Sequence, residues 1–451
     1  HCKLMAKTKS NLRAIPGVDT VLEAVGHCTL PRPLVVATIR DELKALRKNK
    51  EVPSPEKIIE RVGQRLKDLE LSRLQPVING TGILIHTNLG RSPLPALPEG
   101  GYTNLEIDLA SGRRGKRAGY LEGCLAELCG AESAMVTNNC AAALVLILRH
   151  LTEVKKEVVI SRGELVQIGG DYRIPDILES TDARLKEIGT TNRTNLEDYN
   201  KALSKDTALV LKVHRSNFFM EGFVGSPDRR ELAALARKKR VPFVEDVGSG
   251  VFLPTENWAN GHHEPTPKEI LKNGADLVCF SGDKMLGGPQ AGIIAGKAKY
   301  VKALKQHPFF RALRCDKLIL NTLQRTVEAY LHNKTGELPL HQCLNTDLKQ
   351  LKRRANRLEK QLEKLPLSVT VAESQSQIGG GSLPQATLPS TAIDLLPAET
   401  SLKDFAARLR RTSNPVIGVI CDNRFRLDLR TIFPEQEKSL LKSISQALKT
   451  P

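Results

Sequence analysis

Residues 280–290 form the stretch Phe280-Ser281-Gly282-Asp283-Lys284-Met285-Leu286-Gly287-Gly288-Pro289-Gln290, and short apolar runs at 277–280 and 291–295 flank it. Apolar runs of this length predict two buried strands, so that Lys284 lies in the turn between them. A lysine held there, out of water, has a lowered pKa because burial disfavours the ammonium form. Its amine is then a nucleophile for a carbonyl group, in particular the aldehyde of pyridoxal phosphate. The alternative is a glycine-rich hairpin whose lysine faces solvent, as most lysines do.

A second stretch supplies the acid that such a cofactor needs. Residues 241–250 form an apolar run that ends in Glu245 and Asp246 and continues into a glycine-rich turn. Pyridoxal enzymes hold a carboxylate against the ring nitrogen, and an acid at the carboxyl end of a parallel strand faces the ligand crevice. Asp246 precedes Lys284 by an interval that suits a strand, a helix and a strand, and Ser281 lies within reach of the same cofactor's phosphate. The alternative is that the two acids begin a solvated loop.

A third stretch predicts where the phosphate binds. Residues 133–136 indicate a strand, and residues 137–143 open a helix with Asn138, Asn139 and Cys140 at its start. Asparagine caps helices well, and small residues let a phosphate approach the backbone N–H groups. Ordinary capping explains the pattern equally well by itself. The order of phosphate helix, acid and lysine favours an α/β fold like that of aspartate aminotransferase (fold type I).

The ordered motifs resemble one family along most of the chain from about Leu74 onward, the bacterial selenocysteine synthases, or L-seryl-tRNA(Sec) selenium transferases. Besides the stretches above, the matching runs are residues 77–82, 86–91, 112–115, 161–165, 189–194, 311–314 and 379–384. One departure is Cys140, which stands where the family usually has the third of three asparagines. The connection between Arg91 and Tyr102 is also several residues shorter than is usual.

The resemblance implies a reaction and roles for several residues. The family converts L-seryl-tRNA(Sec) to L-selenocysteinyl-tRNA(Sec) through an aminoacrylyl intermediate, with selenophosphate as selenium donor. Lys284 would bind pyridoxal 5'-phosphate covalently, Asp283 would assist proton transfer, and Arg117 would lie in the active site. The resemblance also implies a homo-oligomer, because members of the family form ring-shaped decamers built as pentamers of dimers.

Three further arginines are implied in binding the anionic selenium donor: Arg91, Arg311 and Arg314. Arg311 and Arg314 stand three apart on an expected helix, and paired arginines grip a phosphate-like anion well. From the residues alone, a pair of surface salt bridges is the preferred explanation. Arg113 and Arg114 fit a solvated charge run better than a site.

Composition limits the classes of protein. The chain has 451 residues and a formal net charge of +17, which favours a polyanionic partner such as RNA, although basic charge also serves solubility. Nine cysteines lack C-x-x-C or other metal-binding spacing, so we expect no metal site, reduced thiols and a cytoplasmic location. Neither a membrane span nor a signal peptide is predicted.

Three domains are predicted. Residues 1–73 form a small helical domain with helices at 41–48 and 55–71, and residues 1–75 carry fifteen Lys and Arg against nine Asp and Glu. The resemblance makes this the tRNA-binding domain, although a solvated helical face explains the charge as well. Residues 74–340 form the cofactor domain, with a mainly parallel sheet between helices. Residues 341–451 form a linking helix and a small α/β domain, whose glycines at 379–381 we assign no chemistry.

Two other functions remain open. One is a lyase of the same fold and cofactor that acts on a small amino acid or amino-sugar acid, which would need no basic N-terminal domain. The other is a tRNA-binding protein without catalysis, against which the lysine, aspartate and arginine set argues. His214, at the end of an expected strand, is either a general base or a structural histidine, and we favour the structural role.

Overall fold

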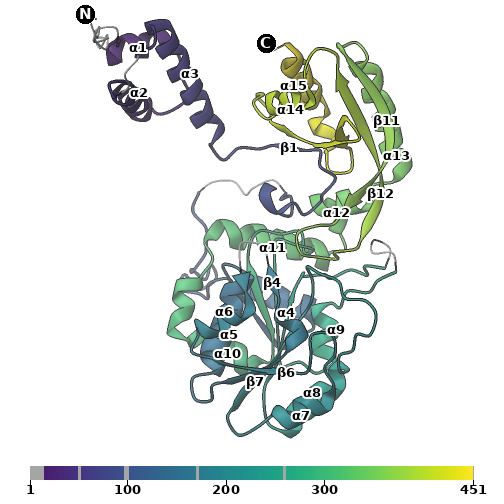
Figure 1. Cartoon of the computed structure of the whole chain (residues 1–451). Coiled ribbons are helices and arrows are strands. Elements are labelled where there is room, and N and C mark those ends of the chain that lie inside the picture. Colours follow the sequence, from purple (N-terminus) through teal and green to yellow (C-terminus); the bar gives the residue numbers. More distant parts are fainter. Residues whose placement is uncertain are drawn as a thin grey trace, which may run out of the picture. The chain divides into compact units, whose positions relative to one another are not determined.

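The computed structural model describes residues 15–48, 52–95, 101–168, 172–256, 258 and 261–449 (Figure 1). The described chain divides into two compact units. One contains the residues up to Val77 together with Ser413–Pro415, and the other contains Ile78–Thr412 and the residues from Val416.

The first unit is built on three helices: α1 (Val18–Val25), α2 (Arg32–Leu46) and α3 (Pro55–Leu71). Apolar side chains at helical spacing meet in its core, among them Ile39, Leu43 and Ile58. The sequence predicted α3 correctly and missed α1. It placed the start of α2 nine residues too late, since the helix begins between Pro31 and Pro33. Proline is tolerated in the first helical turn, where its missing N–H has no intrahelical partner.

The second unit contains a seven-stranded sheet in the order β2-β10-β9-β8-β7-β3-β6. Neighbours from β9 to β6 are parallel, and β10 is antiparallel to both β9 and β2. The strands are β2 (Ser133–Thr137), β3 (Glu157–Ser161), β6 (Arg184–Ile188), β7 (Thr207–Val213), β8 (Phe243–Gly248), β9 (Leu277–Ser281) and β10 (Gly292–Gly296).

Helices cover both faces of this sheet. Successive side chains of its buried strands point to opposite faces, so they pack in two different cores. In β9, for example, Val278 and Phe280 pack on one face and Leu277 and Cys279 on the other. The first face is covered by α4 (Gly119–Cys129), α7 (Leu196–Ala202), α8 (Arg229–Lys238), α9 (Pro267–Lys272) and α11 (Lys317–Leu331). The second is covered by α5 (Cys140–Leu151), α6 (Ile174–Glu179) and α10 (Ala298–Gln306).

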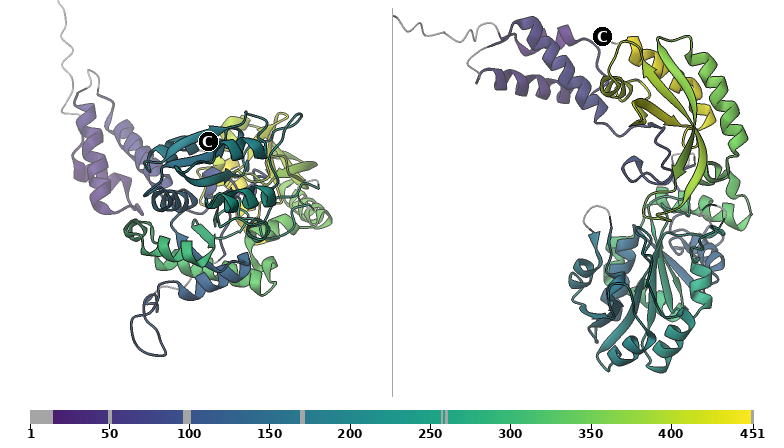
Figure 2. Two further views of the ribbon diagram at one scale, coloured as in Figure 1. Left: turned by 90° about the horizontal axis from the view of Figure 1, so that it is seen from below. Right: turned by 45° about the vertical axis from the view of Figure 1, so that its right-hand side comes forward.

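The C-terminal part of this unit has an antiparallel sheet in the order β11-β12-β15-β14. Its strands are β11 (Leu367–Gln377), β12 (Thr387–Pro397), β14 (Val419–Cys421) and β15 (Arg424–Asp428). Its helices are α13 (Leu348–Leu362), α14 (Leu402–Leu409) and α15 (Glu437–Lys449). The expected apolar seam of α13 is real, since Leu351, Ala355, Leu358 and Leu362 are buried, and α13 lies along the β11–β12 hairpin (Figure 2).

The described chain also contains short elements. They are β1 (Ile78–Asn79), which pairs with β13 (Val416–Ile417), the β4–β5 pair (Gln167–Ile168 and Tyr172–Arg173), and α12 (Pro339–Asn345). Within residues 75–90, only the two residues of β1 form a strand. Among the described residues, no helix combines the length and apolar character needed to cross a membrane.

Candidate active site at the carboxyl edge of the sheet

Lys284 lies in a closed loop between β9 and β10. The Gly282 N–H donates to Ala291 O at 2.8 Å, and the Gly288 N–H donates to Gly282 O at 2.9 Å, which closes the turn. The lysine is only 4% exposed. Burial lowers its pKa, as the sequence predicted, because few water molecules can solvate the ammonium form.

A buried tyrosine braces this loop from α11. The Tyr330 hydroxyl lies 3.1 Å from Leu286 O and 2.7 Å from His341 Nε2. Burial lowers the pKa of His341 to about 4, so the ring is neutral near pH 7. A proton on Nε2 then lets the histidine donate to the tyrosine, while the tyrosine donates to Leu286 O.

Asp246 is a buried acid whose charge acts on the lysine. It lies near the carboxyl end of β8 and is 7% exposed. Burial raises its pKa to about 6, although the nearby Lys284 charge opposes the rise. A side chain on Gly248 would lie 3.7 Å from Lys284 Nζ and 4.0 Å from Asp246 Oδ1. The amine and the carboxylate therefore border the same space, which a side chain at Gly248 would occupy.

The start of α5 also reaches this edge. Asn139 is the N-cap, and its Oδ1 accepts from the Ala142 N–H at 2.8 Å, so the predicted helix start is correct. The Cys140 thiol donates to Asp246 Oδ1 at 3.5 Å. Asn138 is held by its N–H, which donates to Leu313 O at 2.9 Å. Ser281, buried at the end of β9, lies in the same sheet edge.

A glycine turn from the C-terminal part closes on the lysine. Gly379, Gly380 and Gly381 all have positive φ, at 76°, 64° and 71°, a region that other residues seldom adopt. Side chains on the first two would collide with Ile83 and Ile85, and one on Gly381 would lie 3.7 Å from Lys284 Nζ. Sequence reasoning gave these glycines no role. Three consecutive glycines were the available signal, because such a run marks a close backbone approach.

Arg91 and Asp283 form an ion pair beside the lysine. Arg91 Nη1 donates to both carboxylate oxygens of Asp283, at 3.1 and 3.0 Å. The Ser92 N–H donates to Asp283 O at 3.1 Å. Arg91 itself has φ 66°, a left-handed conformation that costs a residue other than glycine about 1–2 kcal/mol. The fold therefore accepts some backbone strain to hold this guanidinium at the lysine loop.

Two of the other predicted arginines, Arg117 and Arg314, contact residues outside the lysine loop. Arg117 donates to Glu106 Oε1 at 3.1 Å and to Cys315 O at 2.7 Å, and Arg314 lies over the Phe310 ring. Arg117 and Arg314 line one cavity of about 550 Å³, whose described lining residues do not include Lys284. We call it the arginine cavity.

The prediction that one helix carries both Arg311 and Arg314 is wrong. Residues Pro308–Leu313 form a short 3-10 helix, and Arg314 follows it with extended backbone. Arg311 is exposed on that helix. The 3-10 helix ends at Leu313, so Arg314 lies outside it and the two arginines do not share a helical face.

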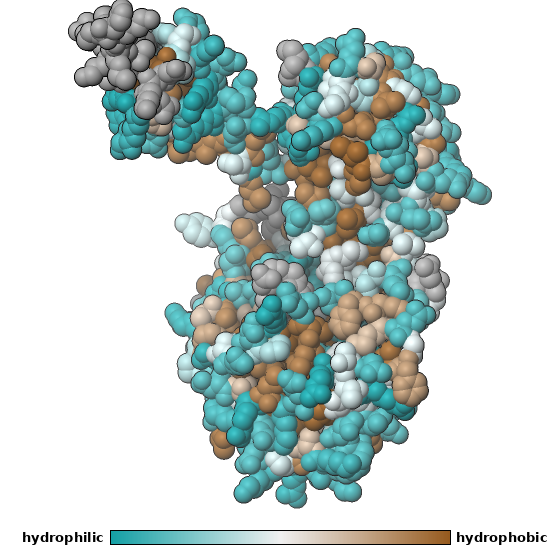
Figure 3. Space-filling model, viewed as in Figure 1, coloured by the Kyte–Doolittle hydropathy of each residue, from teal (hydrophilic) through white to brown (hydrophobic). Residues whose placement is uncertain are grey.

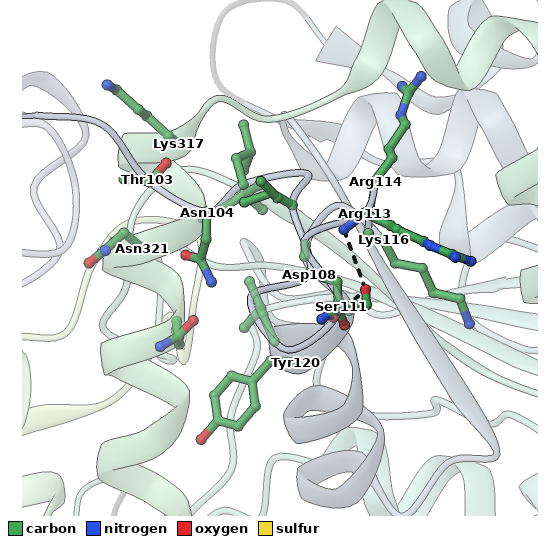
Figure 4. Close-up of a pocket in the computed structure, with 18 residues that line it drawn as sticks. Thr103, Asn104, Asp108, Ser111, Arg113, Arg114, Lys116, Tyr120, Lys317 and Asn321 are labelled. Atoms are coloured by element: carbon green, nitrogen blue, oxygen red, sulfur yellow. Dashed lines mark hydrogen bonds between the residues drawn. The ribbon is translucent and has the colours of Figure 1, made fainter.

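A second cavity, of about 720 Å³, lies beside the basic loop at 112–117 (Figure 4). Arg113, Arg114, Lys116 and Lys317 line it together with Asp108. Arg114 pairs with Glu106 at 3.0 Å. These cations border a concave surface, which the interpretation as a solvated charge run had not suggested.

His214 directly follows β7, beside Asp246 of β8. Its backbone N–H donates to Asp246 O at 2.8 Å, and its Nδ1 lies 3.4 Å from Glu264 Oε1. Burial lowers its pKa to about 3, so the ring is neutral near pH 7. The contacts fit the structural role that the sequence favoured.

A family model described as L-seryl-tRNA selenium transferase matches residues 77–433. The chain belongs to this family. A protein of that activity from Geotalea uraniireducens is 42% identical over 96% of the chain and 98% of its own length. A counterpart from Aquifex aeolicus is 40% identical over 98% of the chain and 99% of its own length. The family predicted from the sequence and the predicted class of enzyme, a transferase, are therefore confirmed.

Solved structures support the predicted fold. That of D-glucosaminate-6-phosphate ammonia-lyase covers 85% of the chain and 98% of its own length, with a TM-score of 0.55 and 19% sequence identity. Together with the sheet order, this likeness confirms the α/β fold class. At 19% identity, the likeness to this lyase is evidence for the fold alone. The alternative function as a lyase is not favoured, because the selenium transferases are 40% identical or more.

Proposed function

We propose that the chain converts L-seryl-tRNA(Sec) to L-selenocysteinyl-tRNA(Sec), with pyridoxal 5'-phosphate as cofactor and selenophosphate as selenium donor. In that reaction the seryl β-hydroxyl leaves as water and selenium takes its place. Family membership supports the overall reaction. The observation that carries the chemistry is the buried amine of Lys284, which borders one space with the buried carboxyl of Asp246.

The residues at this edge fit the cofactor. Lys284, with its lowered pKa, would bind the aldehyde, and Asp246 would hold the ring nitrogen. The N–H groups of Asn139 and Cys140 at the start of α5, the Asn138 side chain and the Ser281 hydroxyl would hold the phosphate. When bound, the cofactor supplies an electron sink for the charge that develops at the substrate's α-carbon. The glycine turn at 379–381 leaves room for it next to Lys284.

The arginines are proposed to bind the anionic donor in two places. Arg91 is held beside the lysine by Asp283, so its charge lies where a reacting anion would arrive. That pair also gives Asp283 a positioning role, with proton transfer as the role that the family resemblance adds. Arg117 and Arg314 line the arginine cavity, and Arg311 is exposed nearby in sequence. We propose that these three receive the donor before it reaches Lys284.

The three-helix unit is the proposed tRNA-binding domain, within a predicted division at residues 1–73, 74–340 and 341–451. On the face shown in Figure 3 its surface is largely hydrophilic. Its described helices carry nearly balanced charge, since Lys3, Lys7, Lys9, Arg13 and Lys50 of the local surplus lie outside the described residues. Replacing only those five cations therefore distinguishes charge attraction from recognition of the tRNA's shape by the helices.

The remaining partners are proposals as well. We propose a homo-oligomer, as in the resembled family, working in the cytoplasm, where aminoacylated tRNA is used. No membrane partner is proposed.

The deciding experiment compares seryl-tRNA(Sec) with seryl-tRNA(Ser) as substrates of the purified protein, in the presence of selenophosphate and pyridoxal phosphate. Selenocysteinyl-tRNA should form from the first and not from the second. Borohydride should fix the cofactor to the peptide that contains Lys284. Equal reaction of both tRNAs, or attachment at another lysine, contradicts the proposal.

Deleting residues 1–72 tests the tRNA-binding unit. Cofactor loading should persist, because the second unit has its own cores, while tRNA(Sec) binding should be lost. Replacing only Lys3, Lys7, Lys9, Arg13 and Lys50 by alanine should weaken binding of every tRNA and reduce its salt dependence. If the deletion variant still prefers tRNA(Sec) to tRNA(Ser), the selecting surface lies elsewhere.

A further inference from the structure

Three side chains from three different elements meet at the carboxyl edge of the sheet. They are Cys140 at the start of α5, Asp246 of β8 and Cys279 of β9. Their sulfur and oxygen atoms all lie within 4.8 Å of one another. Among the described residues, this is the only group of three or more His, Cys, Asp and Glu side chains with such spacing. We call it the thiol cluster.

The donor set of the thiol cluster suits a thiophilic cation. Thiolate ligands select zinc and softer ions rather than magnesium or calcium. Tetrahedral zinc has Zn–S bonds of about 2.3 Å and Zn–O bonds of about 2.0–2.2 Å, which place neighbouring ligand atoms about 3.5–3.8 Å apart. Cys140 Sγ and Asp246 Oδ1 are already 3.5 Å apart. The two remaining separations, from Cys279 Sγ to Cys140 Sγ and to the Asp246 carboxylate, are at most 4.8 Å, and rotation of these side chains by about 1 Å would close them.

The three groups are also available as ligands. In the part of the chain that the structure describes, Asp246 has no ion-pair partner within 4 Å, and both cysteines are free thiols. Cys279 is fully buried and Asp246 is 7% exposed, while Cys140 is half-buried. An ion therefore reaches the cluster past Cys140, and its fourth position is left for water.

We propose that the cofactor-free protein binds a thiophilic divalent cation, Zn²⁺ or Cd²⁺, through Cys140, Asp246 and Cys279, and that this ion and the cofactor exclude each other. The exclusion rests on the proposed function, in which the Asp246 carboxylate holds the ring nitrogen. The same oxygen, Asp246 Oδ1, faces both the Cys140 thiol and the space beside Lys284, so the ion and the ring nitrogen compete for it. Each thiol loses its proton when its sulfur binds the ion, and no electron transfer takes place.

The first test is a Cd²⁺ titration of the protein after removal of its cofactor, followed by the ultraviolet charge-transfer absorption of cadmium–thiolate bonds. Cys140→Ser and Cys279→Ser should each weaken binding at least about 100-fold, because each removes a direct ligand and even loss of an indirect one costs 10–100-fold. Cys421→Ser, at a half-buried thiol in β14, is the matched control and should bind as wild type. Unchanged affinity in both cluster variants overturns the proposal.

A second measurement on the wild-type protein does not depend on how the variants fold. Cd²⁺ binding in weakly buffered solution near pH 7 should release about two protons per ion, one from each thiol. Release of none would mean that the thiols are not ligands, which also overturns the proposal.

The third test separates this inference from the proposed function. Pyridoxal phosphate should lower the apparent Cd²⁺ affinity, and bound Cd²⁺ should slow the growth of the cofactor's visible absorption. Simultaneous binding of both overturns the exclusion. If the cofactor never binds while thiol-dependent Cd²⁺ binding persists, the cation site stands and the proposed function fails.

Discussion

Two groups of charged residues in the second unit differ in how the fold treats them. At the carboxyl edge of the sheet, Lys284, Asp246 and Asp283 are each at least 93% buried. In the arginine cavity, Arg117 keeps 28% of its side chain exposed and Arg314 is exposed. Burial disfavours charged forms and moves pKa values, whereas exposed guanidinium groups stay charged and can meet a mobile anion. This difference supports the proposed roles, which are covalent chemistry and proton control for the first group and anion binding for the second.

The largest effect is expected at the lysine. Lys284→Ala removes the amine that would hold the cofactor, so selenocysteinyl-tRNA formation should fall by at least about 10³-fold, within the range for groups that move protons or attack directly. Lys272→Ala, at an exposed lysine on α9, should leave the rate unchanged. Activity and borohydride labelling measure the effect. Equal loss in both variants would mean that the buried edge has no special role.

The pH dependence of cofactor loading tests Asp246. Its pKa in the cofactor-free protein is raised from 3.8 to about 6, so its carboxylate is present only above about pH 6. Loading should fall about tenfold per pH unit below that point. Because the pKa of Asp246 is higher in the folded than in the unfolded chain, its ionisation also reduces folding stability as pH rises from 4 through 6. The cofactor's visible absorption follows loading, and Asp246→Asn should abolish the step near pH 6; a step near pH 4 would contradict the assignment.

Substitution in the arginine cavity sharpens the comparison from the other side. Arg314→Ala should raise the concentration of selenophosphate needed for half-maximal rate about tenfold, since a charge-assisted contact contributes about 1.5–3 kcal/mol. Cofactor loading should not change, because the described lining of the cavity excludes Lys284. Steady-state kinetics and cofactor absorption separate the two readouts. A loss of loading would show that the two groups are one site.

The glycine turn offers a matched pair of substitutions. Gly381→Ala places a methyl group 3.7 Å from Lys284 Nζ, at a φ of 71°. We expect about 1 kcal/mol of strain and roughly fivefold weaker cofactor binding by titration. Gly336→Ala meets no atom within 4 Å and serves as control. Unimpaired cofactor binding in the Gly381 variant would mean that the turn leaves more room than its geometry indicates.

The smallest effect concerns the brace of the lysine loop. Tyr330→Phe removes a buried hydroxyl that contacts Leu286 O and His341, and should cost about 1–2 kcal/mol of stability. In a domain of this size the melting temperature should fall by about 2–4 °C. Tyr300→Phe, on the half-buried face of α10, should shift it less. Calorimetry measures the melting temperature, and an unchanged value would mean that the Tyr330 hydroxyl does not stabilise the lysine loop.

Local sequence determined much of this protein. The lysine turn follows from glycines and a proline between two apolar runs, and the cap of α5 follows from Asn139, because these are short-range effects of backbone geometry and local hydrogen bonding. The order of phosphate helix, acid and lysine was enough to predict the fold class and, with the other motifs, the family.

Tertiary structure alone decided which distant residues meet. Arg91 and Asp283 pair although 192 positions separate them, and the 379–381 turn reaches Lys284 from the C-terminal part. The thiol cluster exists because α5 starts at the edge where β8 and β9 lie side by side. Strand order and helix packing are set by burial of the whole apolar surface, which no local pattern records.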